Sequence, residues 1–208
     1  MDLSDEALIE KYRVDGDLTV FRVLVKRYQV RIFSQAYRTL GNPEEAEEVV
    51  QDTFVKVHQN LEKYRQQSNF SSWIFRITHN LCMDALRVRQ RRKDMSAVSF
   101  DPQSALVDEE GDKSLNQFPD LKPGPSQQLD QIEQYKVIED SLLSLPETQK
   151  SVVVLHDIQG FSYQEIAEIV GTSIGTVRSR LHYGRLKLKE MLDPYFANDK
   201  KNTPATSR

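Results

Sequence analysis

The chain has 208 residues, of which 28% are charged and 38% hydrophobic, and its formal net charge at pH 7 is −3. This composition is typical of one or two soluble, helix-rich domains, and the longest apolar run, Val152 to Leu155, is far too short for membrane insertion. The single cysteine, Cys82, excludes an internal disulfide, and the four histidines lack the partners of a metal site. Since the acidic N-terminus does not resemble a signal peptide, we expect a cytoplasmic protein.

The charges are distributed unevenly. Residues 76–93 carry six arginines and lysines against one acid, and residues 178–190 carry five against one. Residues 94–133 hold nine acids and two lysines. Two basic segments separated by an acidic one predict nucleic-acid contacts in two places, although the net charge is negative.

Residues 4–93 show helical periodicity throughout. Ser4 is suited to cap a short helix that stops near Gly16. A second helix is predicted over residues 18–40, where apolar side chains recur at helical spacing, and Gly41 ends it. The first half of the chain is therefore predicted to be a helical domain.

A helix start signal opens the third helix. Asn42 is the cap, Pro43 takes the first helical position, and Glu45 completes a capping box. A fourth helix is predicted to begin near Phe70 and to end in the basic segment.

The next residues, 94–126, contain four prolines, many acids and no sustained period, which predicts a flexible linker. A second helical unit begins near Gln127, and Pro146 opens a helix that runs through Leu155. The polar residues after Phe196 predict a disordered tail.

Residues 160–181 carry the signals of a helix-turn-helix. Ser162 and Glu165 form a capping box at the start of its first helix. Ala167 is small where a second helix crosses closely, and Gly171 can take the positive φ of a tight turn. These signals agree, so we predict a DNA-binding motif here.

The second helix of the motif has a buried and an outer face. Ile174, Val177 and Leu181 recur at the spacing of an inward face. The side chains left on or beside the outer face are Thr176, Arg178, Ser179 and Arg180. Arginine can donate two hydrogen bonds to a guanine edge, and hydroxyls can take phosphates. The alternative is an ordinary helical hairpin with a solvated basic face.

Two further patterns each allow two interpretations. Residues 64–76 place aromatics between polar and basic groups, which suits stacking on exposed single-stranded bases. The same pattern fits a packed core, and this favours Phe70 and Trp73 as core residues. The acids of the third helix fit favourable charge at a helix N-terminus, or a partner-binding face that includes Gln51 and Asp52.

Together these segments resemble the extracytoplasmic-function (ECF) sigma factors, small two-domain bacterial initiation factors. The motifs that carry the resemblance lie in residues 21–28, 46–54, 64–80 and 145–181. The resemblance implies an all-α fold with sigma region 2, a flexible acidic linker, a sigma region 4 helix-turn-helix and a tail. These are expected, in that order, at residues 1–93, 94–126, 127–196 and 197–208.

The resemblance also implies three sets of functional residues. Residues expected to bind core RNA polymerase, at the β′ clamp helices, are Glu48, Gln51, Asp52 and Phe54. Residues expected at the −10 element are Tyr64, Arg65, Ser68, Asn69, Phe70, Trp73, Arg76, Asn80, Arg87 and Arg91. Residues expected at the −35 element are Thr176, Arg178, Ser179, Arg180 and Arg185.

The implied partners are core polymerase, through its β′ clamp helices and β flap, promoter DNA, and an anti-sigma protein. A self-standing helix-turn-helix regulator is the alternative; it predicts tight operator binding without polymerase, as a dimer on a two-fold site. An enzyme is not expected, because the sequence shows no phosphate-binding loop, metal set or paired nucleophile. No catalytic residue, cofactor or metal is predicted.

Overall fold

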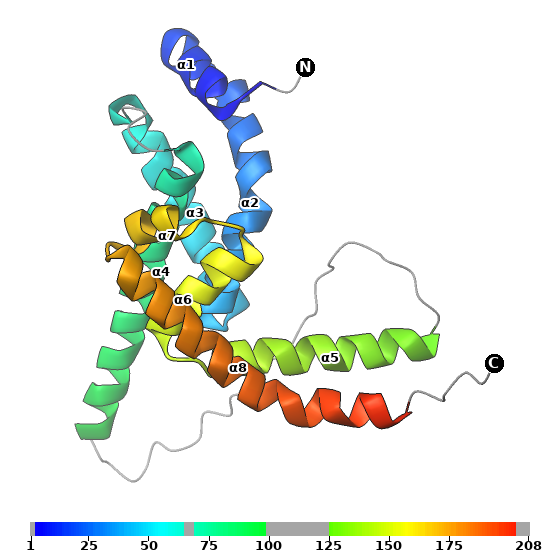
Figure 1. Cartoon of the computed structure of the whole chain (residues 1–208). Coiled ribbons are helices and arrows are strands. Elements are labelled where there is room, and N and C mark those ends of the chain that lie inside the picture. The colour runs from blue at the N-terminus through cyan, green and yellow to red at the C-terminus, as the bar shows by residue number, and fades with distance from the viewer. Residues whose placement is uncertain (1–2, 65–68, 99–124, 203–208) are drawn as a thin grey trace, which may run out of the picture.

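The computed structural model describes residues 3–64, 69–98 and 125–202 (Figure 1). Within these ranges the backbone forms helices and no strands, which confirms the predicted all-α class. No helix in this part of the chain is both long enough and apolar enough to span a membrane.

The described residues of the N-terminal unit form four α-helices and one short 3₁₀ turn. They are α1 (Asp5–Asp15), α2 (Leu18–Leu40), α3 (Pro43–Asn60), η1 (Leu61–Lys63) and α4 (Phe70–Val98). The Ser4 hydroxyl accepts a hydrogen bond from the backbone N–H of Ala7 at 3.2 Å, as expected of the predicted cap. Gly41 ends α2 with a φ of +74°, in the region that glycine adopts without strain.

The start of α3 differs from the prediction in one detail. The Asn42 side chain accepts a hydrogen bond from the backbone N–H of Glu45 at 2.7 Å, so the cap is confirmed. The reciprocal bond of a capping box is not among the contacts of the described residues. The Glu45 carboxylate lies instead 3.9 Å from the guanidinium of Arg89, a residue distant in sequence. The positive charge of Arg89 attracts the carboxylate away from the cap.

In the described part of the C-terminal unit, residues 125–202, there are four α-helices and a π-helical turn. They are α5 (Pro125–Leu143), α6 (Glu147–Val153), η2 (Val154–Ile158), α7 (Tyr163–Val170) and α8 (Ile174–Asn202). The sequence predicted a helix from Pro146 through Leu155. In the structure α6 ends at Val153, and the π-helical turn continues it over residues 154–158.

Helix ends also extend beyond the predicted boundaries. The α4 helix continues over 94–98, which was assigned to the linker, and α8 continues over 197–202, which was assigned to a disordered tail. Neither stretch contains glycine or proline, and polar composition alone does not end a helix. The rest of the predicted linker, up to residue 124, and residues 203–208 lie outside the described residues.

The two units pack against each other, and α7 lies across α4 (Figure 1). One cluster of buried apolar side chains extends from α1 and α2 of the N-terminal unit to α7 and α8 of the C-terminal unit. Phe75 of α4 and Phe161, just before α7, join its two halves, with ring centroids 4.8 Å apart. The helix-turn-helix is therefore held directly against the basic helix α4.

Candidate nucleic-acid interface

The helix-turn-helix comprises α7 and the beginning of α8, as predicted. The Ser162 hydroxyl accepts a hydrogen bond from the backbone N–H of Glu165 at 3.3 Å, and the Glu165 carboxylate accepts one from the backbone N–H of Ser162 at 2.9 Å. Gly171 follows α7 with a φ of +66°. The reciprocal cap and the glycine turn fix where α7 starts and where the chain turns into α8.

The first turn of α8 has its own cap, which the sequence analysis missed. The Ser173 hydroxyl accepts a hydrogen bond from the backbone N–H of Thr176 at 3.1 Å and lies 2.9 Å from the Thr176 hydroxyl. Because Ser173 sits three residues before Thr176, N-cap spacing was the signal that could have found it. This cap orients the start of the helix that is predicted to enter the major groove.

The outer face of α8 presents most of the predicted −35 residues. Arg178 and Ser179 are exposed, while Thr176 and Arg180 are half-buried. Val177 and Leu181 are buried below them, as predicted. Ile174 was predicted to face inward, but it is 44% exposed because it is the first residue of α8, at the edge of the core.

Arg185, the fifth predicted −35 residue, is ion-paired. Its guanidinium donates to both carboxylate oxygens of Asp157, with an Nε–Oδ2 distance of 3.0 Å. This hydrogen bonding raises the pKa of Arg185 above its ordinary value. Asp157 lies in the π turn η2, a rare conformation that often occurs at functional sites. The sequence analysis missed Asp157, because no local pattern links positions 157 and 185.

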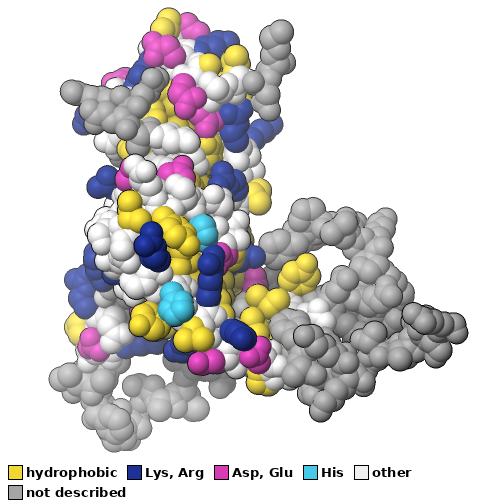
Figure 2. All heavy atoms as spheres, in the orientation of Figure 1, with side chains coloured by type: hydrophobic (Ala, Val, Ile, Leu, Met, Phe, Trp, Pro, Cys, Tyr) yellow, Lys and Arg dark blue, Asp and Glu magenta, His cyan; other side chains and the backbone are white. Residues whose placement is uncertain are grey.

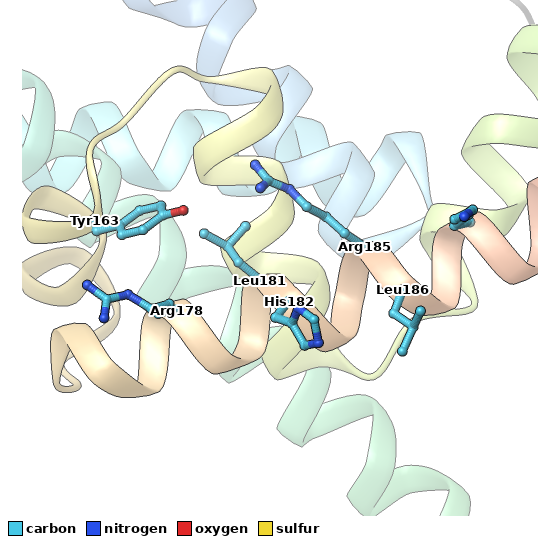
Figure 3. Close-up of a pocket in the computed structure, with 7 residues that line it drawn as sticks. Tyr163, Arg178, Leu181, His182, Arg185 and Leu186 are labelled. Atoms are coloured by element: carbon cyan, nitrogen blue, oxygen red, sulfur yellow. The ribbon is translucent and has the colours of Figure 1, made fainter.

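A shallow hollow lies along this part of α8 (Figure 3). Arg178 and Arg185 extend from α8 on either side of Leu181, and Tyr163 of α7 faces them. Lys and Arg side chains alternate with apolar ones over the face where α7 and α8 lie (Figure 2). A concave surface with cations around an apolar floor is suited to a phosphate backbone and the edges of bases.

A second surface follows one side of α4. Asn69, Arg76, Asn80, Arg87 and Arg91 are all exposed, and they are separated by seven, four, seven and four residues. These intervals place them on one helix face, which we call the α4 stripe. The stripe is roughly 33 Å long at about 1.5 Å per residue, close to one turn of B-DNA.

The aromatic residues predicted to contact the −10 element are mostly buried. Tyr64 is 5% exposed and Phe70 is fully buried, so neither is available to stack on a base in this conformation. Their rings pack on Trp73, with centroids 5.0 and 5.8 Å away, and only Trp73 of the three is partly exposed. Large aromatics that close a small core bury more apolar area than a surface platform does. Arg65 and Ser68 lie outside the described residues.

The predicted polymerase-binding residues of α3 also divide into exposed and buried side chains. Glu48, Gln51 and Asp52 are exposed on the outer face of the helix. Phe54 is 9% exposed and packs edge-on against Phe21, with ring centroids 6.5 Å apart, so it supports the helix from inside. Phe54 thus lies on the buried face of α3, and its assignment as a polymerase contact stays a prediction.

The described residues include no group of three or more metal-ligating side chains. The buried histidine of α4, His79, has a pKa lowered to about 4, first by burial and then by the positive charges of Arg180 and Arg87.

Two family models match the chain. The model described as Sigma-70 region 2 matches residues 24–92, and that described as Sigma-70, region 4 matches residues 135–188. The first contains the outward residues of α3 and the whole α4 stripe, and the second contains the helix-turn-helix. The fold and the basic surfaces thus define a sigma-type transcription initiation factor.

Similarity to curated relatives shows which group of sigma factors the chain belongs to. The chain is 31% identical to the ECF RNA polymerase sigma factor SigW of Bacillus subtilis, over 85% of this chain and 91% of that protein. It is 36% identical to the ECF RNA polymerase sigma factor SigE of Mycolicibacterium smegmatis, over 81% of this chain but only 60% of that longer relative. This chain belongs to the ECF RNA polymerase sigma factors.

Solved structures share the fold. The sigma factor RpoE of Bartonella quintana, in complex with the anti-sigma factor NepR, is 25% identical with a TM-score of 0.62, covering 83% of this chain and 96% of that one. CnrH in complex with the cytosolic domain of CnrY is 25% identical with a TM-score of 0.60, covering 91% and 97%. Both neighbours were solved in complex with a partner protein, which for RpoE is an anti-sigma factor.

Proposed function

We propose that this chain acts in the cytoplasm by binding core RNA polymerase and directing it to promoters with a −35 and a −10 element. The observation that carries the proposal is the pair of basic surfaces, one on the helix-turn-helix and one along α4. It also rests on membership of a family whose curated relatives are RNA polymerase sigma factors. The chain itself supplies recognition and positioning, and the chemistry of RNA synthesis belongs to the polymerase.

At the −35 element, we assign base contacts to Arg178 and Arg180. Arg178 is exposed one turn into α8, where the side chains of a recognition helix reach base edges. A bidentate arginine–guanine contact contributes roughly 1–3 kcal/mol of discrimination. The hydroxyls of Thr176 and Ser179 are suited to phosphate contacts near the helix start, and Arg185 is suited to a phosphate farther along.

At the −10 element, we assign the DNA contacts to the α4 stripe and the exposed edge of Trp73. Asn69 and Asn80 provide amides for base edges, and Arg87 and Arg91 follow the duplex upstream. The buried Tyr64 and Phe70 give Trp73 a rigid support. Separation of the strands exposes bases for which a half-buried indole is a suitable stacking partner.

For the polymerase, we assign the exposed residues Glu48, Gln51 and Asp52 of α3. Their acidic face is complementary to a basic partner surface. We further propose regulation by an anti-sigma protein, supported by the solved neighbour RpoE, whose structure contains the anti-sigma factor NepR.

Transcription with purified core polymerase tests the function. We expect specific start sites on a library of upstream DNA only when the chain is added, and alignment of these sites gives both promoter elements. Tight operator binding by the chain alone, without new starts, would instead identify a self-standing regulator.

The same assay tests the −35 assignment. Arg178→Ala should lower transcription from a matched promoter roughly 10- to 100-fold, as expected from the loss of one bidentate contact. Arg22→Ala, which removes an exposed cation from α2, is the matched control and should leave transcription unchanged. An equal loss in both variants would contradict a specific role for Arg178.

A further inference from the structure

The N-terminal helix α1 is anchored to its neighbours near both of its ends. Close to its start, the Asp5 carboxylate accepts a hydrogen bond from the Tyr28 hydroxyl of α2. In its second half, the Tyr12 hydroxyl lies 3.0 Å from Nε2 of His58, near the end of α3. Ile9, between these contacts, is fully buried. The position of α1 is therefore fixed relative to α2 and α3.

Arg13 of α1 holds the backbone at the end of the α3–η1 segment. Its Nη2 donates to the carbonyl of Leu61 at 3.1 Å and also to the carbonyl of Tyr64. The last carbonyls of a helix have no partner within that helix, so a cation that donates to them stabilises the helix end. The Glu10 carboxylate lies 3.7 Å from the Arg13 guanidinium and helps to orient it. Arg13 therefore fixes the backbone at Tyr64.

The side chain of Tyr64 is buried against the same helix. Burial raises the pKa of its hydroxyl, and the carboxylates of Glu6 and Asp5 raise it further, against an opposing effect of Arg13. Three charged residues of α1 thus act on one ring that is 5% exposed. The position of the Tyr64 ring therefore depends on α1 through its backbone and its side chain.

Tyr64 in turn supports the indole of Trp73. The two ring centroids are 5.0 Å apart, with an interplanar angle of 40°. Trp73 also packs on Phe70, which contacts the ring of Tyr28, the residue bound to Asp5 of α1. Two chains of contacts therefore lead from α1 to the indole, one through Tyr64 and one through Phe70.

These contacts matter because Trp73 is the ring assigned to exposed bases of the −10 element. A binding group is effective only when the residues behind it hold it in the productive orientation. Arg13 is half-buried and its Nη2 is engaged by two carbonyls, so it is suited to positioning rather than to a direct DNA contact. The helix α1 lies outside residues 24–92, which the region 2 model matches, so membership of the family does not assign it this role.

We propose that Arg13 is a positioning residue for the −10 interaction, which fixes Tyr64 and thereby the stacking ring of Trp73. The proposal rests on the proposed function for the role of Trp73 on DNA. The coupling of Arg13 to Trp73 is a property of the free chain and can be measured without polymerase.

Fluorescence of the free chain tests the coupling. Trp73 is the single tryptophan of the sequence, so its emission reports on this site alone. Arg13→Ala removes both hydrogen bonds to the backbone. We expect emission at longer wavelength and roughly twofold stronger quenching by acrylamide, because a ring that loses its support opens to water more often. Unchanged emission and quenching in the folded variant would overturn the proposal.

Three further variants separate positioning from charge and from folding. In Arg13→Lys, one ammonium nitrogen can replace Nη2, which makes both bonds, so quenching should stay near the wild-type value. Arg13→Met keeps an apolar stem without donors, so it should behave as Arg13→Ala and retain more of the packing. Lys11→Ala removes an exposed cation from the same helix and should change nothing. Circular dichroism identifies the folded variants. A lysine variant quenched as strongly as the methionine variant would refute the role of the two hydrogen bonds.

Binding of two DNA probes by the complex with core polymerase tests the consequence. One probe is a single-stranded oligonucleotide with the −10 sequence taken from the start-site alignment, and the other is a −35 duplex. Arg13→Ala should weaken binding of the first roughly three- to tenfold, as expected for an impaired base–aromatic stack. Binding of the second should be unchanged, because the −35 residues lie on α8. Equal weakening of both would overturn the positioning role.

A double-mutant cycle tests whether Arg13 acts through the indole. Trp73→Leu keeps an apolar side chain but removes the stacking ring. In the Trp73→Leu chain, Arg13→Ala should have no further effect on single-strand binding, because the group that it positions is missing. Full additivity of the two substitutions would refute an action through Trp73.

The outcomes separate the two proposals. Polymerase-directed starts by the wild-type chain, with unchanged Trp73 fluorescence in Arg13→Ala, support the proposed function and refute the positioning role. If the wild-type chain directs no starts, the proposed function is refuted, and the fluorescence of the variants still decides whether Arg13 positions Trp73.

Discussion

The recognition helix and the α4 stripe carry similar arginines but are supported differently. The recognition helix α8 is set by local contacts within one short motif, a reciprocal cap at Ser162 and a glycine turn at Gly171. The α4 stripe lies on a 29-residue helix whose orientation depends on aromatic packing between distant segments, such as Tyr28 on Phe70. Changes to the core should therefore affect the α4 stripe more than the recognition helix.

The prediction with the largest expected effect tests whether the α4 stripe depends on aromatic packing. Phe70→Ala removes a fully buried ring that contacts Tyr28, Tyr64 and Trp73, and it should lower the free energy of unfolding by about 3–5 kcal/mol. Asn80→Ala, on the exposed stripe, should change it by less than about 0.5 kcal/mol while lowering promoter-directed transcription. Urea denaturation and the transcription assay measure the two effects. A stable Phe70→Ala variant with defective promoter opening would show that Phe70 acts on DNA after all.

The same contrast explains what could be predicted from sequence. Caps and turns depend on a few neighbouring residues, so the helix-turn-helix, the Ser4 and Asn42 caps and the end of α2 at Gly41 were predictable. The placement of Phe70 and Phe54 depends on which helix faces pack together, and a family resemblance gives that only by analogy. The contacts between the units, such as the hydrogen bond from Arg31 to Gln159, could not be found at all, because these two positions are 128 residues apart and carry no local signal.

A prediction of intermediate size concerns the pH dependence of stability. It rests on the buried His79 of α4, whose pKa is affected by arginines of both α8 and α4. Its pKa is lowered from 6.5 to about 4 in the folded chain, chiefly by burial and then by Arg180 and Arg87. Between these values the unfolded chain binds a proton that the folded chain does not. The free energy of unfolding therefore has its full value above about pH 6.5. It falls by about 3 kcal/mol in all as the pH is lowered toward 4.

Urea denaturation at a series of pH values compares the wild-type chain with His79→Gln. The substitution should remove most of the loss between pH 6.5 and 4, because glutamine does not titrate. Carboxylates elsewhere titrate equally in both chains and cancel in the difference. Parallel stability curves for the two proteins would mean that His79 is protonated in the folded chain as easily as in the unfolded one.

The smallest expected effect concerns Asp157, which is bound to Arg185 beside the recognition helix. Asp157→Asn removes the carboxylate that accepts from the Arg185 guanidinium, so that Arg185 becomes available to a phosphate. Since an exposed ion pair contributes little to stability, the free energy of unfolding should change by less than about 1 kcal/mol. Binding of the polymerase complex to −35 duplex should tighten about two- to fivefold, and its salt dependence should steepen by about one phosphate contact.

Glu168→Gln is the matched control for Asp157→Asn, because it removes one exposed negative charge from the neighbouring helix α7. General charge effects should tighten binding equally in both variants, whereas release of Arg185 should steepen the salt slope in Asp157→Asn alone. Weaker binding by Asp157→Asn would show the opposite relationship, in which Asp157 holds Arg185 in the position that the DNA requires. Either departure from the control would mean that the π turn, through Asp157, acts on the recognition helix at Arg185.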